Sequence, residues 1–132
     1  MTRINSDLDP KLLHRVHLVA ELREITMVPA ALRRSLRTKS AIEVTSSIPK
    51  KFTLNAGHVK FFYNKILFLE KRFNRLADEM EARGYKPNRG RVEAFEGFDP
   101  EWYGNWKSTE EDDLLIAYRI AQRISEKPHL YK

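Results

Sequence analysis

The sequence predicts an all-α fold, a single compact domain of three main helices joined by long ordered loops. Apolar residues recur at steps of three and four in three separate stretches, which is the period of a helix with one buried face. No stretch alternates apolar and polar residues as a half-buried strand does. Because a length of 132 residues suits one domain, residues 1–132 are expected to fold as one unit.

The first helical stretch covers residues 9–38. Asp9 can cap its start, with Pro10 at the first helical position. Pro29 removes one backbone donor and should kink the helix near Ile25. We therefore expect either one long bent helix or two abutting helices. The apolar positions whose spacing indicates this are Leu12, Val16, Val19, Leu22, Val28, Leu32 and Leu36.

A surface connection and a second helix follow. Residues 38–54 are rich in Ser and Thr, contain Pro49 and show no sustained period, which predicts an ordered surface connection. Residues 56–83 then keep the helical period over seven turns, and Gly84 with Pro87 gives a stop signal. The apolar face of this helix is formed by Val59, Phe62, Ile66, Leu69, Phe73, Leu76 and Met80.

The last third of the chain combines a loop with a helix. Residues 85–107 have no clear period, but they contain several aromatic residues, so the loop should pack onto the body of the protein. These aromatic residues include Trp102, Tyr103 and Trp106. Residues 108–127 open with Ser108 and Glu111 at capping-box spacing and with an acidic first turn, which predicts the third helix.

Composition limits the classes of function. The chain has no cysteine, which excludes disulfides, thiolate zinc sites, iron–sulfur clusters and a cysteine nucleophile. A net charge of +6 favours an anionic partner, and nucleic acid is the commonest one for a basic domain. No apolar run approaches the roughly 20 residues of a membrane span, and no secretory signal is present. We expect a cytoplasmic protein, or a nuclear or viral one if the host is eukaryotic.

The stretch HLVAELRE, residues 17–24, places ionisable residues among the apolar ones of the first helix. His17, Glu21 and Glu24 are spaced by four and three residues, so they share about one stripe of the helix. The stripe can be a partly solvated edge with ion pairs, half of a carboxylate metal site, or a catalytic carboxylate with its neighbours. The Glu-x-x-His pairs of di-iron bundles are missing, which disfavours the metal site.

A catalytic carboxylate needs a nucleophile, and the start of the chain offers one. If Met1 is removed, Thr2 carries a free α-amine with a reference pKa of about 7.7 to 8.0, against about 10.4 for lysine. Arg3 beside it would lower that pKa further. Such an amine can attack C1′ of deoxyribose, and a nearby carboxylate can stabilise the resulting iminium. The alternative is an ordinary start with no role.

Four segments carry a family resemblance. They are MTRIN at the start, HLVAELRE in the first helix, NAGHVKFFYNK at the start of the second, and the closing KPHLYK. In this order and spacing the chain resembles, nearly from end to end, the pyrimidine-dimer DNA glycosylases of the phage endonuclease V type.

The resemblance implies two linked reactions on DNA. The glycosyl bond of a cyclobutane pyrimidine dimer is cut, and the strand is then broken by lyase chemistry, with no metal or cofactor and with a base opposite the dimer extruded from the duplex. Thr2 corresponds to the nucleophile and Glu24 to the acidic catalytic residue. The residues at DNA-binding positions, or flanking the site, are Arg3, His17, Glu21, Arg23, Arg119 and Arg123.

The implied partner is double-stranded DNA containing pyrimidine dimers or abasic sites, bound by a monomer without any membrane. Two further basic clusters can contact flanking phosphates or simply keep the surface solvated, and they contain Arg33, Arg34, Arg37, Lys86 and Arg89. Two alternatives remain beside the repair glycosylase. One is an abasic-site lyase of the same fold with weak dimer specificity, and the other is a non-catalytic DNA-binding protein. A metal hydrolase is a more distant third.

Overall fold

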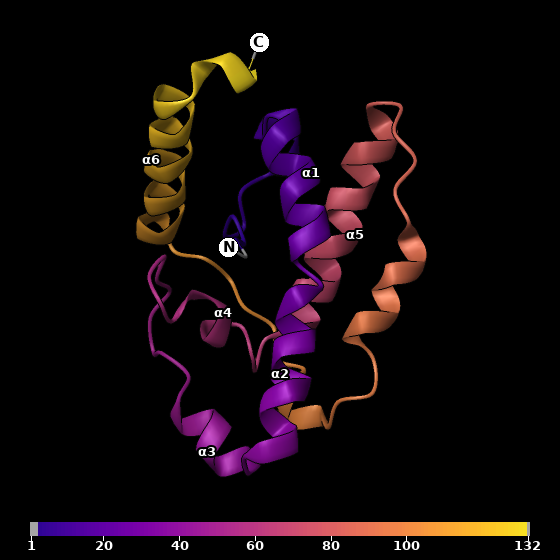
Figure 1. Ribbon diagram of the computed structural model, residues 1–132, viewed down its shortest axis with the longest axis vertical. Helices are drawn as coiled ribbons and strands as arrows, with labels where there is room; N and C mark the ends of the chain where they lie inside the picture. Colours follow the sequence, from indigo (N-terminus) through magenta and orange to yellow (C-terminus); the bar gives the residue numbers. More distant parts are fainter. Residues whose placement is uncertain (1–2, 132) are drawn as a thin grey trace.

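Helices make up the regular secondary structure of the computed structural model, which describes residues 3–131. Within that range there are six α-helices: α1 (Arg15–Glu24), α2 (Met27–Thr38), α3 (Ala41–Ser46), α4 (His58–Phe61), α5 (Ile66–Ala82) and α6 (Glu110–Glu126) (Figure 1). The same range contains four 3₁₀ helices. η1 (Pro10–Leu12) precedes α1, η2 (Arg89–Phe95) and η3 (Pro100–Trp102) lie between α5 and α6, and η4 (Pro128–Tyr131) follows α6. The all-α prediction is confirmed, and the three predicted helical regions appear as α1 with α2, α4 with α5, and α6.

The first predicted region is two abutting helices. Pro29 stands in the first turn of α2 and has no N–H to donate to the carbonyl of Ile25, so the chain bends between the two helices. The predicted start at Asp9 is wrong for the α-helix. The Asp9 side chain caps the short η1, whereas α1 begins at Arg15 with His14 as its N-cap.

The connection over residues 38–54 contains a helix that the sequence analysis missed. Ser40 and Glu43 form a capping box at the start of α3, and Val44 anchors this helix in the core. A helix of six residues offers fewer than two turns, so it has no repeat from which a period could be recognised.

The predicted continuous helix over residues 56–83 is also divided. Phe61, Phe62 and Tyr63 are all buried, and three successive side chains cannot share one face of a helix. The chain therefore leaves the helix after α4 and starts again at α5. The predicted stop is confirmed, because Gly84 has φ +92° and the N–H of Tyr85 donates to the Met80 carbonyl at 2.9 Å.

The loop after α5 packs onto the body, as predicted from its aromatic residues. Trp102 is buried, and Trp106 stacks on Phe52 with ring centroids 5.6 Å apart. The capping box of α6 lies one residue later than predicted. It is formed by Thr109 and Asp112, because their side chains are the ones that reach each other's backbone N–H groups.

The helices are arranged around the start of the chain. In Figure 1, α5 lies along one side of α1 and α6 stands on the other side, with the N-terminal segment between α6 and α1. One α6 residue, Ile116, is fully buried, so α6 covers the body through a narrow contact. None of the helices in the described part of the chain is long and apolar enough to cross a membrane.

Candidate active site

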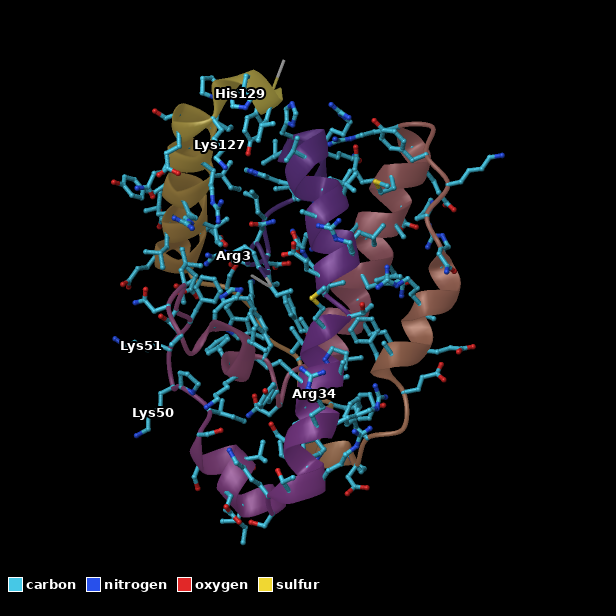
Figure 2. All side chains as sticks on the ribbon, viewed as in Figure 1. Arg3, Arg34, Lys50, Lys51, Lys127 and His129 are labelled. Carbon is cyan, nitrogen blue, oxygen red and sulfur yellow. The ribbon has the colours of Figure 1, made fainter. Side chains whose placement is uncertain are left out.

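The N-terminal segment, residues 3–6, is fixed by hydrogen bonds from four successive residues. These bonds run from Arg3 N to Glu24 Oε1 (3.2 Å), from Ile4 N to His58 Nε2 (2.8 Å), from Asn5 Nδ2 to Glu21 Oε1 (2.7 Å) and from Ser6 Oγ to Asp113 Oδ1 (3.0 Å). The partners belong to α1, α4 and α6. The segment therefore has one defined path between these helices, and Figure 2 shows Arg3 in the space between α6 and α1.

A cavity of about 300 Å³ opens beside this segment, between α1, α6 and η4. We call it the α1–α6 cavity. It brings together six of the residues that the sequence singled out: Arg3, His17, Glu21, Glu24, Arg119 and Arg123. The helices that carry them are about a hundred residues apart in the sequence.

A second cavity, of about 770 Å³, lies on the other side of Arg3, and we call it the α4–α6 cavity. Residues 52–59 form one wall, and Leu115, Tyr118 and Gln122 of α6 form another. Arg3 and Arg119 line both cavities. These two guanidinium groups therefore stand at the boundary between two hollows next to the chain terminus.

The positive charges of the site lie close enough to perturb one another. Burial lowers the pKa of Arg3, and the neighbouring Arg119 and Arg123 lower it further. Over residues 3–131, the buried side-chain nitrogens without a hydrogen-bond partner are Arg119 Nε and His17 Nδ1. An anion in the α1–α6 cavity would relieve the repulsion among the three arginines and could accept a hydrogen bond from Arg119 Nε.

Glu21 is fully buried, which corrects its interpretation as part of a solvated edge. Its Oε2 accepts a hydrogen bond from Arg72 Nε at 2.8 Å, and both side chains of this ion pair are inaccessible to solvent. Arg72 Nη2 reaches the other carboxylate oxygen at 3.1 Å. Glu21 thus joins α5 to Asn5 of the N-terminal segment and supports the cavity from beneath.

Glu24 faces the α1–α6 cavity with its carboxylate partly exposed. Its Oε1 accepts the Arg3 N–H, and its Oε2 lies 3.8 Å from the guanidinium of Arg23. The Arg23 side chain is 63% exposed and lines neither of the two cavities. Of the two neighbours on α1, Glu24 is therefore the one that stands next to the start of the chain.

The end of the chain forms the wall of the α1–α6 cavity opposite the N-terminal segment. Tyr131 of η4 places its hydroxyl 2.6 Å from His17 Nε2, and its ring packs edge-on against His14 and His17. Burial, followed by His14 and Arg123, lowers the pKa of His17, which favours a neutral imidazole. Tyr131 belongs to the closing KPHLYK segment, but no role could be assigned to it from the sequence, because nothing in the spacing links it to His17.

The other candidate residues lie away from the two cavities. Arg33 donates to the carbonyl of Glu96, and Arg89 is ion-paired with Asp78 and Glu81. Arg34 lies on α2, well below Arg3 in Figure 2, and Arg37 and Lys86 likewise line neither cavity. Thr2 lies outside the described residues.

The chain matches a known protein family. A sequence model of the family described as pyrimidine dimer DNA glycosylase matches residues 1–92 of the 132. The chain belongs to this family. The match covers the N-terminal segment, α1 and α5, and with them His17, Glu21, Glu24 and Arg72. Membership of this family makes the protein a DNA repair glycosylase whose substrate is DNA, and the resemblance drawn from the sequence is confirmed.

The part of the site carried by α6 and η4 lies beyond the matched residues. Arg119, Arg123 and Tyr131 of this glycosylase are brought to the α1–α6 cavity by the fold. Residues inside the matched range therefore line one part of this cavity, and residues beyond it line another.

Proposed function

We propose that this enzyme cleaves the N-glycosyl bond of cyclobutane pyrimidine dimers and then nicks the strand by β-elimination, through a Schiff base with the Thr2 α-amine. It acts as a metal-independent monomer without a cofactor. The observation that carries the proposal is the hydrogen bond from Arg3 N to Glu24 Oε1 at 3.2 Å. Thr2 directly precedes Arg3, so covalent geometry keeps its α-nitrogen within about 4 Å of this backbone nitrogen.

The chemistry then follows from an amine beside a carboxylate. The α-nitrogen forms a bond to C1′ as the bond from C1′ to the base breaks, and the base leaves with the electron pair and takes up a proton. The attached nitrogen gives up a proton, and its lone pair then opens the sugar ring at the bond between C1′ and O4′. O4′ keeps the bonding electron pair and takes up a proton, which leaves the iminium, whose positive charge the Glu24 carboxylate stabilises. Loss of a C2′ proton expels the 3′ phosphate, with Glu24 accepting or relaying that proton.

The arginines of the α1–α6 cavity serve the DNA backbone in this proposal. Arg3, Arg119 and Arg123 repel one another in the free protein, and phosphate oxygens accept charge-assisted hydrogen bonds from guanidinium groups. Arg119 Nε is buried without a partner in the free protein, and a shift of this side chain onto a phosphate oxygen would give it one. Extrusion of a base opposite the dimer costs less where damage has already weakened the pair, so it can contribute to selectivity.

One observation favours a second candidate, an abasic-site lyase of the same fold with weak dimer specificity. Lys127, Leu130 and Tyr131 line the α1–α6 cavity but lie outside the residues that match the family. Recognition of the dimer can depend on this wall, whereas the lyase step needs Thr2 and Glu24. The two candidates share a mechanism and differ in substrate.

Borohydride trapping separates the candidates, because it reduces the iminium to a stable covalent adduct. The enzyme is incubated with a duplex containing one dimer and with a matched abasic duplex, and the adduct is mapped by mass spectrometry. An adduct on the Thr2 nitrogen with both duplexes supports the proposal, and one with the abasic duplex alone supports the second candidate. Attachment to a lysine, or an intact Met1 in fully active protein, contradicts both. Activity that survives EDTA supports metal independence.

Substitution of Glu24 by Gln tests its catalytic role. Glu24→Gln removes the charge without changing the size of the side chain, so strand cleavage should be lost while damaged DNA is still bound. Glu93→Gln, an exposed carboxylate far along the chain on η2, is the matched control and should cleave normally. Wild-type turnover by Glu24→Gln would remove this residue from the mechanism.

A further inference from the structure

His58 is a buried histidine that the mechanism above does not use. It is the first residue of α4 and is 2% exposed, with its ring packed edge-on against Phe52 and Phe62 at centroid distances of 5.6 and 5.5 Å. It lies on the floor of the α4–α6 cavity rather than in the α1–α6 cavity that holds Glu24. An aromatic setting alone would suit phenylalanine as well as histidine, so the two ring nitrogens need an explanation.

Both ring nitrogens have partners of fixed hydrogen-bonding character. The Ile4 backbone N–H can only donate, and it lies 2.8 Å from Nε2. The Thr53 carbonyl can only accept, and it lies 2.8 Å from Nδ1. His58 is therefore neutral, with its proton on Nδ1 and its lone pair on Nε2 directed at the N-terminal segment.

The charged groups around His58 are consistent with this neutral form. Burial lowers its pKa to about 4, the Thr53 carbonyl acts in the opposite direction, and then Arg3 lowers and Glu21 raises it. Protonation would place an N–H on Nε2 directly against the Ile4 N–H. The contact that fixes Ile4 therefore exists in the neutral state alone.

The same side of the segment is held at a neighbouring position. The Arg3 guanidinium donates to the Leu54 carbonyl at 3.1 Å, close in sequence to Thr53. Glu24 holds the Arg3 backbone from the opposite side, on α1. The backbone that leads to Thr2 is thus held between α1 and residues 53–58. Loss of the His58 contact would leave the hydrogen bond of the flexible Arg3 side chain on the side of residues 53–58, so the backbone at Ile4 would be held less precisely.

We infer that His58 is a positioning residue, a neutral imidazole that accepts the Ile4 N–H and so aims the chain terminus at the DNA sugar. The inference rests on the proposed function, since it assigns His58 to the placement of the Thr2 amine. His58 touches neither the sugar nor the base. Its effect should therefore appear in the rate of covalent attachment rather than in DNA affinity.

Two substitutions separate the hydrogen bonds from the packing. His58→Phe keeps a ring against Phe52 and Phe62 but loses both hydrogen bonds, whereas His58→Gln retains an amide oxygen that can accept the Ile4 N–H. We expect His58→Phe to slow single-turnover borohydride trapping on a saturating abasic duplex roughly 10- to 100-fold, the range typical of a misplaced reacting group. Its Kd for the duplex should be little changed, and His58→Gln should recover part of the rate.

Two further measurements exclude a purely structural effect. The pH profile of trapping should move toward that of an ordinary α-amine in His58→Phe, because the amine leaves its fixed place among Glu24 and the arginines. Exchange of the Ile4 amide hydrogen should also be faster. Phe73→Leu is the control, since it weakens the core where Phe73 packs against Phe95 but keeps the hydrogen bonds of the N-terminal segment, and it should leave the pH profile of trapping unchanged.

The outcomes distinguish this inference from the proposed function. No trapped adduct in the wild-type enzyme would refute the proposed function itself. Normal trapping in the wild type with an equal rate and an equal pH profile in His58→Phe would overturn the positioning role alone. If His58→Phe does not fold, His58→Gln is compared with the wild type instead. This variant loses the Nδ1 bond to Thr53 but keeps an acceptor for the Ile4 N–H, so it should be less stable while its trapping rate stays close to that of the wild type. A trapping rate as low as that expected for His58→Phe in a folded His58→Gln protein would contradict the positioning role.

Discussion

Two buried ionisable residues that contact the N-terminal segment are stabilised in different ways. Glu21 is charged and is compensated by Arg72, whose guanidinium reaches both carboxylate oxygens. His58 is uncharged and serves as an acceptor. Removal of one partner of a buried ion pair leaves an uncompensated charge, which typically costs about 3 to 5 kcal/mol. A neutral histidine carries no such cost until it is protonated, so its contribution depends on pH.

This dependence predicts a loss of stability in mild acid. In the unfolded chain His58 has an ordinary pKa of 6.5, and in the folded protein its pKa is about 4, so between these values the unfolded state binds more protons. The His58 contribution is complete above pH 6.5 and is lost as pH falls toward 4. Between pH 7 and pH 4.5 the free energy of unfolding should fall by on the order of 2 to 3 kcal/mol more in the wild type than in His58→Gln.

Urea denaturation of both proteins at the two pH values measures this difference. All other titrating groups are common to the two proteins, so their contributions cancel in the comparison. Parallel pH dependence in the wild type and His58→Gln would mean that His58 binds its proton equally well in the folded and the unfolded chain. The acceptor role at Ile4 would then be excluded.

At the residue scale, sequence spacing could identify the ionisable face of α1 but not the residues of other elements that act with it. His17, Glu21 and Glu24 sit on α1 at intervals of four and three, and the structure places all of them at the α1–α6 cavity. Arg72 and His58 carry no local pattern that links them to this face. They reach it through tertiary packing, which joins residues more than fifty positions apart. The role of Glu21 as a buried support was for this reason invisible in the sequence.

At the element scale, the long apolar periods correctly predicted where helices form, but they did not predict every point at which a helix is interrupted. The stop at Gly84 and the break before Pro29 follow from backbone chemistry, and the sequence predicted both. The break between α4 and α5 follows instead from the burial of three successive aromatic residues. It also depends on the loop that docks there, since the Gly104 N–H donates to the Asn64 carbonyl at 3.1 Å.

This docking predicts that Gly104 tolerates no side chain. A Cβ atom at Gly104 would lie 2.3 Å from the backbone oxygen of Asn64, and neither backbone can move without opening the start of α5. Gly104→Ala should therefore lower the free energy of unfolding by about 1 to 3 kcal/mol, the usual cost of overpacking. Thermal or urea unfolding measures the change.

Gly90→Ala is the matched control for this substitution. At Gly90 a Cβ atom would meet the flexible Asn88 side chain at 3.2 Å, and the backbone conformation is open to any residue. Both variants reduce the freedom of the unfolded chain equally, so the control should change stability by less than about 1 kcal/mol. Equal effects in the two variants would show that the contact between Gly104 and Asn64 is not tight.

At the scale of the whole molecule, the fold separates basic residues into two kinds. Arg3, Arg119 and Arg123 gather around one cavity, where they raise the local positive potential. Arg89 lies on the far side of α5, where hydrogen bonds and ion pairs with Glu81 and Asp78 raise its pKa. The net charge of +6 predicted an anionic partner, but it could not show which arginines are already neutralised by neighbouring carboxylates.

The salt dependence of DNA binding tests this separation. Each phosphate contact releases counterions, so the slope of log K against log salt concentration reports how many cationic side chains reach the backbone. Arg119→Ala should weaken binding to a dimer-containing duplex and reduce the slope by roughly one. Arg89→Ala removes the same charge from the chain. Because Arg89 is already ion-paired with Asp78 and Glu81, DNA affinity and slope should stay close to those of the wild type. Equal losses in the two variants would show that net charge, rather than the α1–α6 cavity, governs binding, and an unchanged slope in Arg119→Ala would exclude that residue from the DNA interface.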